Sequence, residues 1–203
     1  MAELLPGLTV SDETVAQLRG FAADLAHWSA AINLVAPSSL SDSWNRHILD
    51  SAQLYCLAPA GARHWADLGS GGGLPGLVIA ILASGQDMQV TLVESDQRKS
   101  AFLRRQITDR SLNAQVRANR AEQLAPLAAD VVSARALAPL ERLLPLVHRH
   151  LTPGGTALLP KGRRWATELE AAWAGWSFDC EDLPSAVDPE SRILRLTRLR
   201  PKD

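Results

Sequence analysis

Cysteine is scarce in this 203-residue chain, and its two examples, Cys56 and Cys180, stand far apart. That separation has neither the spacing of a zinc site nor that of a redox motif, and sparse thiols suit a reducing compartment. No apolar run approaches the roughly 18 residues of a membrane span, and the opening "MAELLPGLTV" has no basic region followed by an apolar one. We therefore expect a cytoplasmic protein without a membrane span or a metal site.

Net charge is also nearly absent. The chain has 21 Lys and Arg and 22 Asp and Glu, so its formal net charge is −1. The electrostatic field of the whole protein would therefore not attract it to a polyanion. Cations do cluster over residues 161–164 and 192–200, which predicts at most a local basic face. A hydrophobic content of 46% supplies a full core for one domain, and we expect a monomer.

The first 60 residues follow a helical rhythm. Residues 12–31 place apolar side chains at helical spacing, with Ser11 or Asp12 at the N-cap, and the pattern resumes over 41–58 after Pro37. A different rhythm begins at His64. We therefore predict two parts, a helical cap over residues 1–60 and a main domain over residues 61–203.

Seven short β-rich runs alternate with helical stretches in the main domain. They cover residues 64–69, 89–95, 114–119, 129–135, 155–160, 176–183 and 192–199. Strands separated by helices favour crossover connections and a parallel sheet covered on both faces, and the last two runs resemble an antiparallel closing pair. The expected fold is an α/β, Rossmann-like, seven-stranded and mainly parallel sheet.

A glycine-rich loop, "DLGSGGGLPG" at residues 67–76, follows the first of these runs. Glycines let a backbone approach a ligand closely, and Pro75 suits the first turn of a helix that we expect over residues 74–83. Glu94 ends the next run, 25 positions after Gly69, where a carboxylate accepts ribose hydroxyls. These features fit a nicotinamide dinucleotide and S-adenosylmethionine equally well, because the loop also contains a G-x-G-x-x-G frame.

Further stretches accompany the loop in a fixed order. "INLVAPSSLSDSWNRHILDS" precedes it, and "VTLVESDQRKSAFLRR", "VVSARALAPLERLL" and "LLPKGR" follow. Over residues 25 to 165 their order and spacing resemble the RsmG family, also called the glucose-inhibited division protein B family, of 16S ribosomal RNA guanine-N7 methyltransferases. Ala134 and Gly72 depart from the family pattern, but neither change removes a group that the chemistry needs.

The resemblance implies a class I S-adenosylmethionine-dependent methyltransferase, with residues 61–203 as the methyltransferase domain. Its substrate would be N7 of a guanosine in the 530 loop of 16S ribosomal RNA, in the decoding region of the small subunit. That nitrogen carries a free lone pair, so alignment rather than a general base should dominate catalysis. The resemblance implies the following cofactor residues: Gly69, Ser70, Gly71, Gly73 and Leu74 at the methionine and ribose, Glu94 at the ribose hydroxyls, Ala121 and Glu122 at the adenine, and Arg135 closing the site.

Asp50 and Arg135 are the catalytic candidates. The resemblance implies that Arg135 closes the site, whereas the chemistry favours a carboxylate near the guanine to offset its developing positive charge, which Asp50 or Glu122 could supply. The candidate RNA-binding residues are Arg46, His47, Lys161 and Arg163. Arg46 can equally form an i, i+4 pair with Asp50 that only orders a helix, and Arg163 can be a solvated charge at a helix start.

Three other functions remain open on the residues alone. A small-molecule methyltransferase would use the same fold, because a net charge near zero does not demand RNA. A nicotinamide dehydrogenase would need a hydride-transfer acid and a second nucleotide-binding half, and neither is apparent. A nonenzymatic binding module would have lost cofactor affinity, which the intact glycines and Glu94 argue against.

Overall fold

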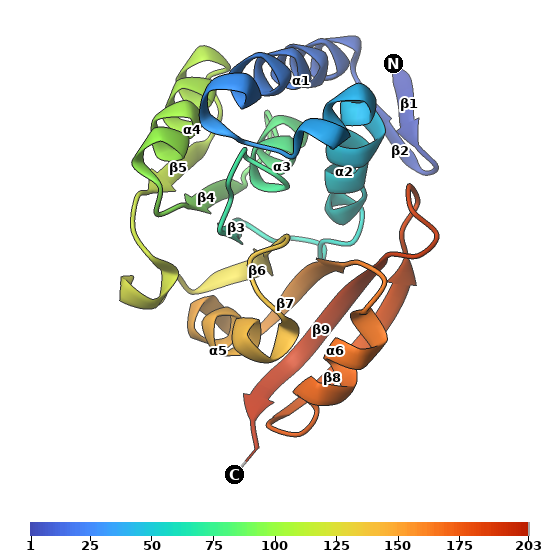
Figure 1. Ribbon diagram of the computed structural model, residues 1–203, viewed down its shortest axis with the longest axis vertical. Coiled ribbons are helices and arrows are strands. Elements are labelled where there is room, and N and C mark those ends of the chain that lie inside the picture. Colours follow the sequence, from blue (N-terminus) through green and yellow to red (C-terminus); the bar gives the residue numbers. More distant parts are fainter. Residues whose placement is uncertain (203) are drawn as a thin grey trace.

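The computed structural model describes residues 1–202 and contains a seven-stranded sheet (Figure 1). Its strand order is β5 (Ala114–Arg117), β4 (Gln89–Val93), β3 (His64–Leu68), β6 (Ala129–Ser133), β7 (Leu151–Lys161), β9 (Arg192–Pro201) and β8 (Trp176–Pro184). Within this sheet β9 runs opposite to the other six strands, so its pairings with β7 and β8 are antiparallel and the remaining pairings are parallel. The predicted α/β class, the mainly parallel sheet and the antiparallel closing pair are confirmed.

Helices cover both faces of the sheet (Figure 1). One face carries α1 (Asp12–Ile32), α2 (Asp50–Tyr55), α3 (Gly76–Leu82) and α4 (Gln97–Asp109), and the other carries α5 (Leu140–His150) and α6 (Trp165–Ala172). Successive strand side chains alternate between the two cores: Trp65 packs under the first group and Ala66 under the second. Burial on both faces explains why the central strands read as continuous apolar runs. Within residues 1–202 no helix has the length and hydropathy needed to cross a membrane.

The N-terminal segment agrees only partly with its prediction. Helix α1 is confirmed, and the side chain of Ser11 caps it by accepting a hydrogen bond from the Thr14 N–H at 3.1 Å. The expectation of a purely helical segment is wrong, because β1 (Ala2–Leu5) and β2 (Leu8–Val10) form an antiparallel hairpin around Gly7. Strands of three or four residues are too short to display alternation in a sequence.

The second predicted helix of this segment is divided into three pieces. A 3₁₀-helix, η1 (Pro37–Asp42), leads into a π-helical stretch, η2 (Trp44–Leu49), and then into α2. Phe21 of α1 and Ile48 of η2 belong to the same core as Trp65 of the sheet. The N-terminal segment and the sheet therefore share one core, without a break in the packing at the predicted domain boundary near residue 60. That boundary stays a prediction.

Candidate active site

Asp67, which sequence reasoning did not single out, holds the start of the glycine loop. It is fully buried near the end of β3, where its Oδ2 accepts from the Gly76 N–H at 3.1 Å and its Oδ1 accepts from the Ser133 hydroxyl at 2.8 Å. The Ser70 hydroxyl donates to the Asp67 carbonyl at 2.9 Å. Helix α3 begins at Gly76 rather than at Leu74 as predicted, and these bonds fix the loop between β3 and α3. The available signal was an acid within an apolar strand, directly before the glycines.

Burial raises the pKa of Asp67 to about 6, because desolvation outweighs its hydrogen bonds. The folded state therefore holds this proton more tightly than the unfolded chain, and stability should fall as the pH rises from about 4 to about 6. We expect wild type to lose about 2–3 kcal/mol relative to Asp67→Asn between about pH 4 and about pH 8. Denaturant unfolding of both proteins at the two pH values measures this loss. A difference that does not change with pH would show that the charge at Asp67 is not the cause.

Glu94, directly after β4, faces the loop. The residue is 8% exposed. Its Oε2 accepts a hydrogen bond from the Gly71 N–H at 2.9 Å, and its Oε1 accepts one from the Asp96 N–H at 2.7 Å. Each carboxylate oxygen keeps a second lone pair. The pair of oxygens can therefore still accept the two hydroxyls of a ribose, which fits the predicted role.

Two adjoining cavities surround the loop. One, of about 250 Å³, is lined by Gly69, Gly71, Glu94, Ala121 and Glu122 together with other residues, and the other, of about 360 Å³, is lined by Ser70, Leu74 and Arg135 among others. Eight of the nine predicted cofactor residues thus line one cavity or the other. The remaining one, Gly73, lines neither cavity; it has φ +89°, and a Cβ there would stand 2.4 Å from the Leu77 side chain.

A buried histidine orients the predicted adenine end of the first cavity. The His150 Nε2–H of α5 donates to the Ala121 carbonyl at 2.9 Å, and Ala121 begins the short 3₁₀-helix η3 (Ala121–Gln123). This hydrogen bond fixes the Ala121 backbone to α5 and thus to the core on the α5 and α6 face of the sheet. Its contact with an adenine ring stays a prediction.

Arg135 connects the sheet with the N-terminal segment. It follows β6, and its Nη1 donates to Asp50 Oδ2 at 3.3 Å and to the Arg46 carbonyl at 3.2 Å. Both terminal nitrogens lie 3.4 Å from His47 Nδ1. Burial raises the pKa of Asp50, and the neighbouring Arg135 partly offsets that shift. The structure thus brings together four predicted residues from two distant parts of the chain, Arg135 after β6 and Arg46, His47 and Asp50 of the N-terminal segment.

His47 is neutral in this arrangement. Burial and the charges of Arg135 and Arg46 lower its pKa to about 4. The Ser39 hydroxyl donates to the Ala36 carbonyl at 2.6 Å and lies 2.8 Å from His47 Nε2, so Nε2 carries the hydrogen and Nδ1 accepts from Arg135. His47 therefore offers no positive charge near neutral pH and instead orients Arg135, and its contact with RNA stays a prediction.

The two predicted RNA-binding cations of the C-terminal half are occupied by other partners. The Lys161 side chain is 8% exposed, and its ammonium donates to the Ala138 carbonyl at 3.0 Å and to Glu168 Oε2 at 2.9 Å. Glu168 Oε2 also accepts from the Leu140 N–H at 2.9 Å, so this pair fixes the segment after Arg135. Arg163 is exposed and pairs with Glu190 at 2.6 Å. Their roles in RNA binding stay predictions.

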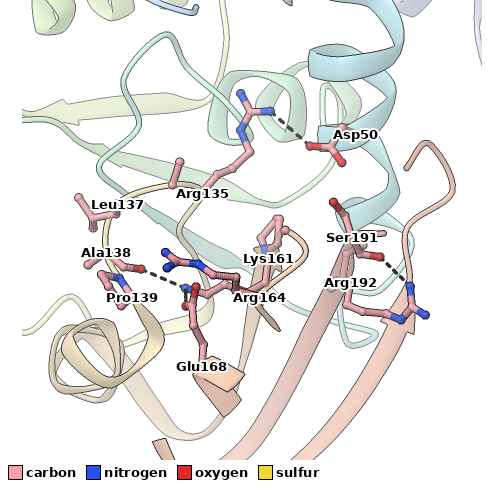
Figure 2. A pocket seen from close by; sticks show the side chains of 14 residues that line it. Asp50, Arg135, Leu137, Ala138, Pro139, Lys161, Arg164, Glu168, Ser191 and Arg192 are labelled. Carbon is pink, nitrogen blue, oxygen red and sulfur yellow. Dashed lines mark hydrogen bonds and ion pairs between the residues drawn. The ribbon is translucent and has the colours of Figure 1, made fainter. Parts of the chain in front are cut away.

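A third cavity, of about 440 Å³, lies beyond Arg135 (Figure 2). Its walls come from residues 135–139, from the end of β7 and the start of α6, and from the start of β9. Ala136, at φ +54°, lines all three cavities. Leu137 lies over Gly69, so that a Cβ on Gly69 would stand 2.6 Å from Leu137 Cδ1. No sequence pattern predicts this junction at Ala136, because it depends on how the segment after β6 packs against the glycine loop.

Similar solved structures share this arrangement of sheet and helices. The TehB-like S-adenosylmethionine-dependent methyltransferase from Corynebacterium glutamicum aligns over 90% of this chain and 98% of its own, with a TM-score of 0.59 and 18% identity. TYW2 from M. jannaschii in complex with AdoMet aligns over 77% of this chain and 76% of its own, with a TM-score of 0.56 and 14% identity. The fold, with its glycine loop and the acid after the next strand, is that of a class I S-adenosylmethionine-dependent methyltransferase.

Sequence relatives narrow the class to one family. The profile of GidB, described as rRNA small subunit methyltransferase G, matches residues 14–191. Ribosomal RNA small subunit methyltransferase G of Rhodospirillum centenum is 51% identical, covering 95% of this chain and 88% of its own. The protein of the same name from Ruegeria pomeroyi is 49% identical, with coverage of 94% and 94%. The chain belongs to the GidB family.

Family membership confirms the resemblance seen in the sequence. The chain is an S-adenosylmethionine-dependent ribosomal RNA methyltransferase, and the choice of cofactor that the glycine loop left open falls on S-adenosylmethionine. The matched range also extends past the motifs through β8 and ends at residue 191, directly before β9.

Proposed function

We propose that this chain transfers the methyl group of S-adenosylmethionine to N7 of a guanosine in the 530 loop of 16S ribosomal RNA. It would act as a cytoplasmic monomer on the small ribosomal subunit or its RNA, with residues 1–60 as a cap on a methyltransferase domain of residues 61–203. The names of the relatives, which are methyltransferases of small-subunit ribosomal RNA at about half identity, support this substrate. The 250 Å³ and 360 Å³ cavities at the glycine loop support the cofactor.

When bound, S-adenosylmethionine supplies an electrophilic methyl group on a sulfonium centre. Guanine N7 has an in-plane lone pair and no proton to lose. The protein therefore has to align the base with the methyl group and does not have to remove a proton. Glu94 and the loop backbone would hold the cofactor, and Arg135 would border both the cofactor and the target base. Asp50 would offset the positive charge that develops on the methylated guanine.

One observation carries this proposal: three possible general bases that line a cavity together with Ala136, namely Asp50, Glu168 and the neutral His47, each already have a side-chain partner. Asp50 is engaged by Arg135, Glu168 by Lys161, and the lone pair of His47 by Arg135. Such groups are poor general bases because deprotonating a substrate would cost them a buried partner. They suit positioning, which is what a reaction at N7 requires.

Mass spectrometry of ribosomal RNA tests the reaction and its target. Deleting the gene should remove 7-methylguanosine from the 530-loop fragment of 16S RNA, and expression of this chain should restore it. Substituting 7-deazaguanosine at the target in an otherwise accepted RNA should abolish methylation, because the reacting nitrogen is replaced by carbon. If 7-methylguanosine persists at that fragment in the deletion strain, the proposed substrate is wrong and a small-molecule acceptor becomes the alternative.

A further inference from the structure

We propose that the 440 Å³ cavity beyond Arg135 receives the target guanosine as a whole nucleotide turned out of the RNA, and that Arg164 binds its phosphate. This inference rests on the proposed function and adds a binding site and a residue to it. Figure 2 shows the cavity, with Arg164 among the labelled side chains that line it.

The position of the cavity is the first support. The two cavities at the glycine loop share Ala136 with the third one, and the third contains no residue of that loop. A methyl acceptor has to reach the cofactor from outside the cofactor site, and the third cavity adjoins that site at Ala136. The size also fits, since cavities for small ligands are typically about 300–1,000 Å³.

The charge balance of the cavity is the second support. Two of its cations have carboxylate partners, since Arg135 pairs with Asp50 and Lys161 with Glu168. Within residues 1–202, no carboxylate oxygen lies within 4.0 Å of a nitrogen of Arg164 or Arg192, although both line the cavity. The cavity thus keeps an excess of positive charge that a phosphate would neutralise.

Arg164 rather than Arg192 fits the phosphate. Arg192 Nη1 already donates to the Pro189 and Ser191 carbonyls at 2.9 and 3.0 Å, and its guanidinium stacks 5.5 Å from the Trp165 ring centre. Arg164 is exposed and has no such engagement among the hydrogen bonds of the described chain. Its planar fork is therefore open for a phosphate, which it can bind through two parallel hydrogen bonds.

The walls of the cavity suit the rest of a nucleotide. Leu137, Pro139, Pro160 and Ile193 supply apolar surface for the faces of a base, while the Arg135–Asp50 pair forms the end nearest the cofactor cavities. Enzymes that modify a base take it out of the stack and enclose it in such a pocket. The guanine would then lie towards Arg135 and the phosphate towards Arg164.

A comparison of two ligands tests the phosphate site without turnover. Wild type should bind guanosine 5′-monophosphate about 10- to 100-fold more tightly than guanosine in ligand-detected NMR titrations, because a charged hydrogen-bonded pair forms only with the former. Arg164→Ala should remove this preference. Arg104→Ala, whose side chain is exposed on α4 and outside the cavity, should keep it.

Kinetics with unmethylated small ribosomal subunits complete the test. Arg164→Ala should raise KM for the subunit by about tenfold or more, with S-adenosylmethionine affinity unchanged by calorimetry. Arg104→Ala, an exposed arginine on α4 at the other face of the sheet, is the charge-matched control and should match wild type. If Arg164→Ala retains the preference for the monophosphate, or if wild type shows none, Arg164 is not the phosphate site. A wild-type protein that fails to methylate the subunit would instead overturn the proposed function.

Discussion

Replacing Glu94 with alanine is expected to weaken S-adenosylmethionine binding by about 100- to 1,000-fold. The Glu94 carboxylate is buried, and it would accept two ribose hydroxyls in addition to the Gly71 and Asp96 N–H groups that it accepts in the structure. Alanine removes both charged acceptors and releases the loop backbone at Gly71. Isothermal titration calorimetry of wild type and Glu94→Ala measures the change.

Glu94→Gln is the matched variant for this prediction. Its side chain has nearly the same size, but its amide NH₂ replaces one of the two acceptors and would face a backbone N–H. We expect an affinity between those of wild type and Glu94→Ala, about tenfold below wild type. An affinity of Glu94→Ala within about threefold of wild type would exclude Glu94 as a ribose-binding group.

Replacing Gly71 with valine is expected to abolish measurable S-adenosylmethionine binding, a loss of more than about 1,000-fold. Gly71 has φ +55°, and a Cβ built there meets nothing closer than the Gly69 carbonyl oxygen at 3.8 Å. The side chain would not clash with the protein, and it would extend into the two cavities that Gly71 lines. A branched residue at positive φ also costs about 1–3 kcal/mol of strain.

Gly85→Val is the control that separates the effect of backbone strain from the effect of a side chain that occupies the cofactor cavities. Gly85 has φ +81°, a Cβ there meets no atom within 4 Å, and it lies between α3 and β4, outside both cavities at the glycine loop. Both variants should lose stability in denaturant unfolding, but only Gly71→Val should lose cofactor affinity in calorimetry. Equal cofactor affinities in the two variants would contradict the placement of the cofactor at Gly71.

Much of the fold could be predicted because its central strands are short apolar runs separated by helical stretches. Trp65 and Ala66, for example, lie on opposite faces of a sheet that is buried on both sides, and a sequence shows such a strand as a continuous apolar segment. The hairpin at residues 2–10 and the π-helical stretch at 44–49 were not predictable in this way. The first has too few residues for a pattern, and the second is a short stretch of i→i+5 hydrogen bonds that apolar spacing does not distinguish from an α-helix.

The directions of several other charged side chains could not be predicted from the sequence. Adjacent arginines illustrate this: Arg163 pairs with Glu190 on the surface, whereas Arg164 lines the 440 Å³ cavity. Lys161, which the motif pattern favours for RNA contact, is directed inward to Glu168. Helix phase and the position of a partner decide each direction, and both depend on the packed structure.

The sequence by itself determined the sheet, the glycine loop with its acid after the next strand, and the family, because these depend on local patterns and on the order of short motifs. Only the tertiary structure decided how Arg135 is held, since its partners Asp50 and His47 lie 85 and 88 positions away along the chain. The same holds for the junction of the three cavities at Ala136. Contacts between distant segments form only when the two cores pack, so no local pattern encodes them.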